Sequence, residues 1–410
     1  MTLAQTLALV LVGVTFFGVA AGSYPGLKMN RATIALVGAV ALVALRVLTT
    51  ATALQAVDPN TLVLLFAMMV VAAHLRLAGF FDLVSQWLAR HTHSPRRLLA
   101  FVILAAGLLA ALVLNDTVVV AFTPLVLELT EQLERDPLPY LMGLAAAANI
   151  GSTATITGNP QNILIGQSSG IGFVDFMLTL GPVALVGLAL AWGIIVLIYR
   201  AEFSRPWSHE ASTAKLGAQV NTWQLSKCLI VIGLMLIAFL AGVPVALAAI
   251  VAACVLLITR RTEPETIFTQ VDWQLLVFFT GLFVVTGALD ATHLSDRLLA
   301  LVAPITAGGV APLALITAAL SNIISNVPAV LLFRSVVPQL ADPRRAWLTL
   351  AMASTLAGNL TLLGSVANLI VAETARARGV KLSFREYLRA GVPITIVTLA
   401  VGILWLSFVH

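Results

Sequence analysis

The sequence predicts an all-α polytopic membrane protein with two inverted-topology repeats, each containing a helical hairpin and a broken transmembrane helix. Three observations support this fold class: long apolar segments, an internal duplication, and polar interruptions at matched positions. Of the 410 residues, 60% are hydrophobic and 10% are charged, whereas a soluble domain carries roughly 25% charged residues. Apolar segments of about 18–20 residues can each cross a hydrocarbon core as a helix. Examples are 3–21, 32–45, 226–241 and 391–409.

Composition also narrows the class of function. The formal net charge is +5, but Lys and Arg in a membrane protein report its topology, so we expect no nucleic acid partner. The sequence contains no metal-ligand cluster, phosphate loop or nucleophile motif of the usual form. We therefore expect no metal, no enzymatic activity, and no cofactor beyond a coupling ion, H+ or Na+. Cys228 and Cys254 lie on separate apolar spans, and we interpret them as small buried hydrophobic residues.

The two halves of the chain resemble each other in four stretches that follow the same order. "GNPQNILI" (158–165) matches "GSVANLIV" (364–371), and "LNDTVVVAFTPLVLEL" (114–129) matches "SNVPAVLLFRSVVPQL" (325–340). Two further matches pair "DPNTLVLLFAMMVV" with "DWQLLVFFTGLFVV" and "GFVDFM" with "SFREYL". Four matches in one order indicate an internal duplication. We divide the chain into a first inverted repeat (1–200), a cytoplasmic linker (201–223) and a second inverted repeat (224–410).

Each half contains the same succession of elements. In order, these are three apolar spans, a short amphipathic segment, two apolar arms that meet at a polar tip, a long span with a polar middle, and a final span. In the first half they are 3–21, 30–48, 60–78, 80–95, 97–114, 117–133, 140–167 and 179–199. In the second half they are 226–241, 243–259, 273–289, 291–303, 309–325, 328–340, 346–373 and 390–409. The arms add an even number of crossings to five spans, whether they cross fully or re-enter, so the repeats are inverted, as is typical of secondary transporters.

Basic residues indicate the orientation. Of the 23 Lys and Arg residues, 18 lie in or beside loops on one side of the predicted membrane, four lie on the other (Arg46, Arg297, Arg344 and Arg345), and Arg334 lies within the second pair of arms. The positive-inside rule makes the crowded side cytoplasmic. We therefore expect a multi-pass protein of the cytoplasmic (inner) membrane, with both termini extracytoplasmic.

The long span of the first half is interrupted by "STATITGNPQN" (152–162). Gly and Pro make a continuous helix there costly, by about 1 kcal/mol for each Gly and ~3 for the Pro. In hydrocarbon, irregular backbone persists only where protein or a water-filled cavity surrounds it. A packing seam of small residues is the alternative, but it does not explain asparagines at matched positions. We predict a binding site that includes Ser152, Thr153, Thr155, Asn159 and Asn162, with Asn359, Thr361, Ser365 and Asn368 from the second half.

The two polar tips complete the predicted site. Asn115, Asp116 and Thr117 divide the first pair of arms, and Ser325 and Asn326 precede Pro328 in the second. We expect the tip side chains to cap helices. Asp116 is the only acid at either tip or in either broken middle, and a buried carboxylate is costly unless it is paired, coordinated or protonated. It is either the N-cap of the second arm or a carboxylate that couples transport to a proton or cation, and we favour the coupling role.

Four stretches together resemble a known group of proteins. "LNDTVVVAFTPLV", "STATITGNPQNILIG", "LSNIISNVPAVLL" and "GSVANLIVAE" are similar to the arsenite permease (ArsB-type) and related anion permeases of the ion transporter superfamily. That superfamily also holds sodium/proton antiporters of the NhaD type and dicarboxylate or citrate carriers. The resemblance implies a homodimer of elevator transporters, in which a scaffold of early spans holds still and a domain of hairpins and broken helices moves. It also allows a cytoplasmic ATPase subunit as a partner.

The predicted function is secondary active transport in the lipid bilayer. We expect proton-coupled efflux of arsenite, antimonite or another small inorganic anion or metalloid, as in arsenic resistance, with Asp116 carrying the proton. Both cysteines lie outside the site elements, so arsenite would be held as its neutral hydroxide by hydroxyls, amides and carbonyls. A sodium/proton antiporter of the NhaD type would use the same carboxylate. A dicarboxylate carrier and an ion channel with the hairpins as filter loops are further alternatives.

Overall fold

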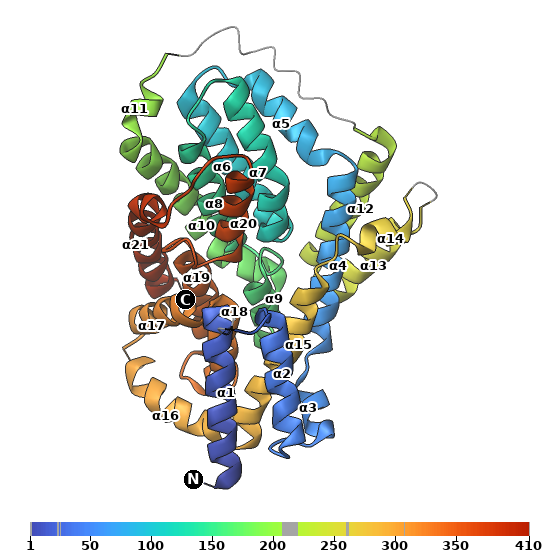
Figure 1. Ribbon diagram of the computed structural model, residues 1–410, viewed down its shortest axis with the longest axis vertical. Helices are drawn as coiled ribbons and strands as arrows, with labels where there is room; N and C mark the ends of the chain where they lie inside the picture. Colours follow the sequence, from blue (N-terminus) through green and yellow to red (C-terminus); the bar gives the residue numbers. More distant parts are fainter. Residues whose placement is uncertain are drawn as a thin grey trace.

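The computed structural model describes residues 2–22, 24, 26–206, 220–259, 262–306 and 308–409 (Figure 1). Every regular element within these residues is a helix, and seven of the helices described there are long and apolar enough to cross a membrane. The all-α polytopic fold class is therefore confirmed. Of the predicted linker, residues 207–219 lie outside the described part of the chain.

The helices of the first half are α1 (Leu3–Ala21), α2 (Arg31–Ala44), α3 (Thr50–Ala56), α4 (Pro59–Leu77), α5 (Phe80–His91), α6 (Pro95–Leu112), α7 (Asn115–Gln132), α8 (Pro137–Ser152), α9 (Pro160–Ser169), α10 (Phe173–Ile198) and α11 (Arg200–Phe203). Those of the second half are α12 (Thr222–Leu240), α13 (Val245–Leu257), α14 (Pro264–Phe268), α15 (Trp273–Ala291), α16 (Leu294–Thr306), α17 (Val310–Ile324), α18 (Asn326–Phe333), the short 3₁₀ helix η2 (Val337–Gln339), α19 (Pro343–Ala357), α20 (Val366–Ala377) and α21 (Phe384–Phe408).

The helices form two bundles. The frame bundle consists of α1–α4 and α12–α15, and the hairpin bundle consists of α6–α10 and α17–α21 (Figure 1). In the hairpin bundle, α6 packs along α8, α17 along α19, and α10 along α21. The bundles meet chiefly where α4 contacts α9, α1 contacts α17 and α15 contacts α18. The frame and the hairpins are thus separate packing units joined by a limited set of contacts.

In the frame bundle, a helix from one half of the chain packs against a helix from the other half. Helix α2 packs along α15, and its counterpart α13 packs along α4, the counterpart of α15. In Figure 1, α4 rises from α3 to α5 whereas α15 descends from α14 to α16, so the two run in opposite directions. Exchange of this kind is what two inverted copies produce. The boundaries of the repeats at 200 and 224 stay a prediction.

Amphipathic helices α5 and α16 connect the bundles, each between the third span and the hairpin of its own half. A residue in the left-handed region precedes each of them: Gly79, with a φ of 79°, and His293, with a φ of 56°. A non-glycine residue at positive φ is uncommon. These two connections, through α5 and through α16, therefore turn sharply at the same place in the repeat.

The hairpins and the helix breaks lie where the sequence predicts them. Helix α6 ends at Leu112 and α7 begins at Asn115, whereas α17 ends at Ile324 and α18 begins at Asn326. The breaks span residues 153–159 and 358–365. Pro160 takes the first position of α9, where its missing N–H costs nothing.

Two elements are shorter than predicted. The second arm of the later hairpin ends at Phe333 rather than at residue 340, because Pro338 lacks an N–H and its ring clashes with the carbonyl four residues earlier. The span predicted at 30–48 forms a helix only over Arg31–Ala44, since Arg46 adopts a φ of 59°. The short connecting helices α3 and α14 were not expected from the sequence.

Helices α6 and α8 approach closely at two glycines. A Cβ at Gly151 would overlap with the backbone of Gly107, including its carbonyl oxygen. We expect Gly151→Ala to lower the free energy of unfolding by about 1–3 kcal/mol, as overpacking does, measured as a lower Tm in detergent. Gly181→Ala in α10 is the matched control because an added Cβ there meets nothing within 4 Å. Equal Tm values for the two variants would contradict the close approach.

Candidate functional site

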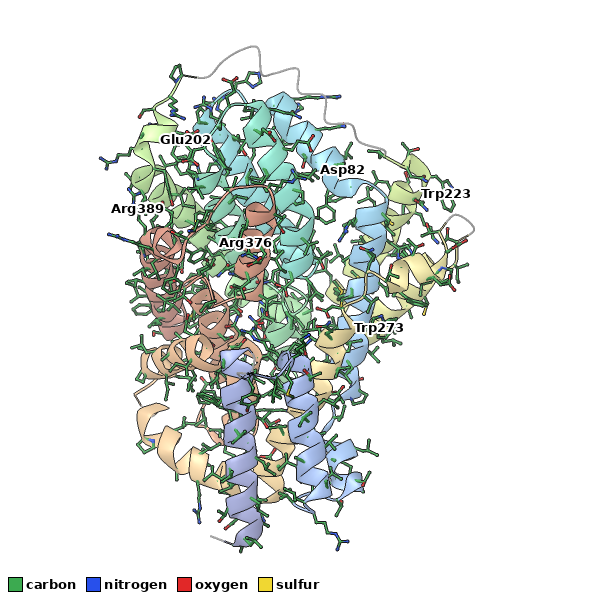
Figure 2. The ribbon with its side chains drawn as sticks, in the orientation of Figure 1. Asp82, Glu202, Trp223, Trp273, Arg376 and Arg389 are labelled. Carbon is green, nitrogen blue, oxygen red and sulfur yellow. The ribbon has the colours of Figure 1, made fainter. Side chains whose placement is uncertain are left out.

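A cavity of about 610 Å³ lies between the two bundles. The hairpin bundle lines it with both hairpin tips and with the first residues after each helix break, and the frame lines it with the start of α2 and the start of α15. Trp273, labelled in Figure 2, marks the beginning of α15 at this place. The polar residues from the hairpin bundle are Asn115, Asp116, Gln161, Ser325, Asn326 and Ser365, and those from the frame are Asn30, Arg31, Asp272 and Gln274.

Four helix N-termini of the hairpin bundle converge on this cavity. Its lining includes the first residues of α7, α9, α18 and α20. Helix N-termini present free N–H groups and a partial positive charge, so they favour negative charge nearby. Asp116 supplies such a charge from the first turn of α7.

The Asp116 side chain has no hydrogen-bond or ion-pair partner among the described residues, although the residue is half-buried. The interpretation of Asp116 as an N-cap is wrong, because the cap position of α7 is Leu114 and no side chain caps that helix. Ser325 occupies the cap position of α18, with a φ of 78°, and it also makes no side-chain cap bond. A backbone hydrogen bond instead holds the start of α7: Asn115 N donates to the Gly158 carbonyl (2.9 Å).

Asparagines at matched positions hold the two helix breaks. Asn162 Nδ2 donates to the carbonyl oxygens of Ser152 (3.0 Å) and Thr155 (2.9 Å). Asn368 Nδ2 donates to those of Gly358 (2.7 Å) and Thr361 (3.1 Å). Each residue of the second set lies 206 positions after its counterpart in the first. These bonds satisfy carbonyls that the breaks expose, so both asparagines are structural members of the site rather than cavity-lining groups.

Two buried hubs join the halves, and sequence reasoning missed both. Asn149 Nδ2 donates to Asn359 Oδ1 (2.9 Å) and Asn368 Oδ1 (3.1 Å). Its Oδ1 accepts from Asn115 Nδ2 (3.1 Å) and from Ser365 Oγ (3.0 Å).

Thr355, at the position that matches Asn149, is the second hub. Its Oγ1 accepts from Asn159 Nδ2 (3.2 Å) and Gln161 Nε2 (3.2 Å), and donates to Asn162 Oδ1 (3.5 Å). A buried Asn in an alanine-rich helix was the available sequence signal for the first hub. The residue types at the two hubs differ, so the internal duplication did not point to them.

The predicted site residues fall into three groups. Those that line the cavity are Asn115, Asp116, Ser325, Asn326 and Ser365. Those that hold the breaks behind it are Ser152, Thr153, Thr155, Asn159, Asn162, Asn359, Thr361 and Asn368. Thr117 lies in the first turn of α7 but is not among the residues that line the cavity. Asp272, Gln161 and Arg31 line the cavity and were not predicted.

Comparison with known proteins identifies the family. The citrate transporter family model (CitMHS) matches residues 16–357. The chain belongs to the citrate transporter family. It is therefore a multi-pass membrane transporter and not an enzyme. The narrower resemblance to arsenite permeases stays a prediction.

Several relatives of this transporter match it over nearly its whole length. It is 30% identical to the "46 kDa membrane protein" of Mycobacterium leprae, over 97% of this chain and 99% of the relative. It is 32% identical to the "Silicon efflux transporter LSI3" of Oryza sativa subsp. japonica, over 93% of each. The crystal structure of the Alcanivorax borkumensis YdaH transporter covers 98% of this chain and 96% of its own, with a TM-score of 0.59 and 17% identity. That likeness shows a shared fold.

The asparagine contacts at the breaks can be tested by isosteric substitution. Asn162→Asp and Asn368→Asp would each remove two N–H donors from buried carbonyls, and an unsatisfied buried polar group costs about 1–3 kcal/mol. We expect both variants to show a clearly lower Tm in detergent. Asn221→Asp is the matched control, since Asn221 caps α12 by accepting a bond from Gln224 N and Asp caps helices equally well. Asn162 or Asn368 variants as stable as this control would contradict the assigned role.

Proposed function

We propose that this transporter exports a small, uncharged oxyacid, of the arsenite, antimonite or silicic acid class, in exchange for protons. The observation that carries the proposal is the unpartnered Asp116 carboxylate in a cavity whose other polar side chains are amides, hydroxyls, Asp272 and Arg31. Arsenous and silicic acids are both small neutral hydroxides near neutral pH. The name of the rice relative, a silicon efflux transporter, supports the same class of solute.

Charge at the cavity argues against free citrate. The charged side chains that line it are Asp116, Asp272 and Arg31, so two carboxylates face one guanidinium. Like charges in a partly buried cavity repel more strongly than in water. A tricarboxylate would have to overcome this repulsion, whereas a neutral oxyacid would not.

Proton exchange follows from competition at Asp116. The ionised carboxylate accepts hydrogen bonds from the O–H groups of an oxyacid, and such charge-assisted bonds are stronger than neutral ones. Protonation turns one carboxylate oxygen into a donor and weakens this binding. Solute and proton therefore bind alternately, as exchange requires. An anionic solute would bind better to the protonated form, and its transport would be a symport.

The two-bundle architecture supports an elevator mechanism. All the polar side chains at the tips and breaks belong to the hairpin bundle, whereas Arg31 and Asp272 belong to the frame. The bundles share a limited set of contacts and are linked through α5 and α16. We propose that the hairpin bundle moves as a rigid unit against the frame and carries the solute across the membrane.

Location and partners are further parts of the proposal. We place the transporter in the cytoplasmic membrane with both termini outside, on the distribution of basic residues. An apolar groove between α2 and α15, lined by Leu36, Val40 and Val284, offers a frame surface for a homodimer. Coupling to a cytoplasmic ATPase subunit is compatible with this orientation.

A sodium/proton antiporter is the second candidate, because two carboxylates in an oxygen-rich cavity also suit a cation. Proteoliposomes with an imposed pH gradient distinguish the two. We expect proton-driven flux of arsenite, antimonite and germanic acid (a stand-in for silicic acid) in sodium-free buffer, and little flux of citrate. Sodium-driven proton movement without any oxyacid would favour the antiporter instead.

The role of Asp116 is tested by Asp116→Asn. A hydrogen bond to a charged group contributes about 1.5–3 kcal/mol, so we expect the affinity for arsenite to fall about 10- to 100-fold. Proton-driven arsenite flux should be lost, and any residual arsenite flux should not depend on pH, because no titrating group remains at that position. Asp82→Asn on α5 (Figure 2) is the matched control and should keep the wild-type profile. Unchanged pH dependence in Asp116→Asn would remove Asp116 from the mechanism.

The elevator is tested by access to the cavity from the two sides. Leu363 lines the cavity and is 63% exposed. We expect Leu363→Cys, with Cys228 and Cys254 replaced by Ala, to react with a membrane-impermeant maleimide from the cytoplasmic side. Excess external solute should make the same cysteine reactive from outside. Labelling from one side alone under all conditions, in a variant that still transports, would contradict movement of the hairpin bundle.

A further inference from the structure

We propose that a groove along the start of α21 binds an anionic phospholipid, with Arg385 and Arg389 on its phosphate and an acyl chain along the apolar part of the groove. The inference goes beyond transport of the solute and does not depend on it. The groove has a volume of about 730 Å³ and is distinct from the cavity between the bundles.

The groove faces the membrane. Helix α21 packs along α10 on the side of the hairpin bundle that lies away from the frame (Figure 1). Exposed aliphatic side chains on the two helices, such as Leu197 and Ile396, indicate a face in contact with lipid. Arg389, labelled in Figure 2, lies at this outer edge of the bundle. A ligand of the groove therefore reaches it from the bilayer.

The charges along α21 place the groove at the edge of the hydrocarbon. The charged residues of this helix are Arg385, Glu386 and Arg389, and residues 390–408 carry no charge. An uncharged helix of that length spans about 28 Å, close to the ~30 Å of a hydrocarbon core. The two arginines therefore lie at the level of the headgroups, and Val392 and Pro393 lie just below them, at the level of the acyl chains.

Basic and apolar side chains share one face of the helix. Arg385, Leu388, Arg389 and Val392 are spaced by three and four residues, which brings them to the same side of α21. All four line the groove. A phospholipid has the same succession of groups, a phosphate above and an acyl chain below. An acidic peptide would match the arginines but not the apolar part that lies within the membrane.

Arg389 is held in position before any ligand binds. Its Nη2 donates to the Ile198 carbonyl at the end of α10 (3.3 Å), and its Cζ lies 5.5 Å from the centre of the Tyr199 ring. Its Nη1 lies 3.7 Å from Glu386 Oε1, which also accepts from Tyr199 Oη (2.7 Å). A guanidinium has five N–H groups, so Arg389 keeps donors for a phosphate. A side chain fixed in this way loses less entropy on binding.

The charge of the groove selects an anionic lipid. Arg385 has no hydrogen-bond or ion-pair partner among the described residues, and Glu386 offsets only one of the two positive charges. Guanidinium and phosphate groups form strong, paired hydrogen bonds. Phosphatidylcholine also carries a phosphate, but its ammonium group would lie beside the arginines and be repelled. Phosphatidylglycerol has no such group.

The test titrates the purified full-length protein in a neutral detergent with phosphatidylglycerol or phosphatidylcholine, and native mass spectrometry counts the bound lipids. We expect phosphatidylglycerol to bind the wild-type protein about tenfold more tightly than phosphatidylcholine. Arg385→Gln combined with Arg389→Gln should remove this preference. Phosphatidylglycerol should also raise the Tm of the wild-type protein more than that of the variant, because a ligand of the folded state stabilises it.

Matched variants separate the groove from general surface charge. Arg96→Gln combined with Arg97→Gln removes the same charge from exposed residues at the start of α6 that do not line the groove, and it should keep the wild-type preference. Val392→Trp keeps both arginines but fills the apolar part, so it should weaken phosphatidylglycerol binding about tenfold.

A single substitution covers the case in which the double arginine variant fails to fold. Arg385→Gln removes no contact that the described structure contains, so it should leave Tm without lipid unchanged. It should weaken phosphatidylglycerol binding about threefold, as loss of one of two charges predicts.

Four outcomes would overturn the inference. Wild-type preference in the double arginine variant would exclude the arginines, and equal loss in the α6 control would reduce them to general surface charge. Unchanged binding in Val392→Trp would exclude the groove. Competition by glycerol phosphate, which lacks acyl chains, would assign the arginines to a soluble anion. Loss of a dimer without loss of lipid would assign the groove to a second copy of the chain. None of these measurements requires transport, so the proposed function is tested separately.

Discussion

The structure depends on how two interrupted helices satisfy their backbone in the middle of a membrane protein. Hydrocarbon offers no hydrogen bonds, so every carbonyl freed by a break needs a donor from the protein. Asn162 and Asn368 provide those donors. Their side-chain oxygens then bond Thr355 and Asn149 of the opposite half. One residue type at one matched position thus stabilises each break and joins the two repeats.

A functional cavity follows from this arrangement. With their carbonyls satisfied, the breaks can start α9 and α20 beside the hairpin tips that start α7 and α18. Four positive helix ends then surround Asp116, which makes a charged carboxylate tolerable where the surroundings are mostly apolar. In the proposed function, the proton on Asp116 and the hydroxyls of a solute compete for the same oxygens. The same local physics would then account for the break, the half-buried acid and the proposed exchange.

Much of this architecture could be predicted because the same residue types recur at matched positions of the two halves. Gly158 and Pro160 interrupt a helix by elementary chemistry, and the recurrence of Gly158 and Asn162 as Gly364 and Asn368 identified the second break and the second copy. The two hubs show no such recurrence in the sequence, since Asn149 matches Thr355 rather than another amide. Their partners lie some two hundred positions away and are brought together only by folding. The alternative role of Asp116 as the cap of α7 was wrong, because Leu114 occupies the cap position and Asn115 and its contacts hold the hairpin turn.

Exchange of partners between the halves has a consequence for how the protein is made. Of the residues along most of α4, 67% are buried, and its principal neighbour, α13, is synthesised much later in the chain. Helix α2 likewise waits for α15. During translation, the first half must remain in the lipid as an unfinished assembly whose polar groups, such as Thr61 and His74, have not yet found their protein surroundings. A nascent chain that stops before α15 is therefore a natural substrate for the proteases of membrane-protein quality control.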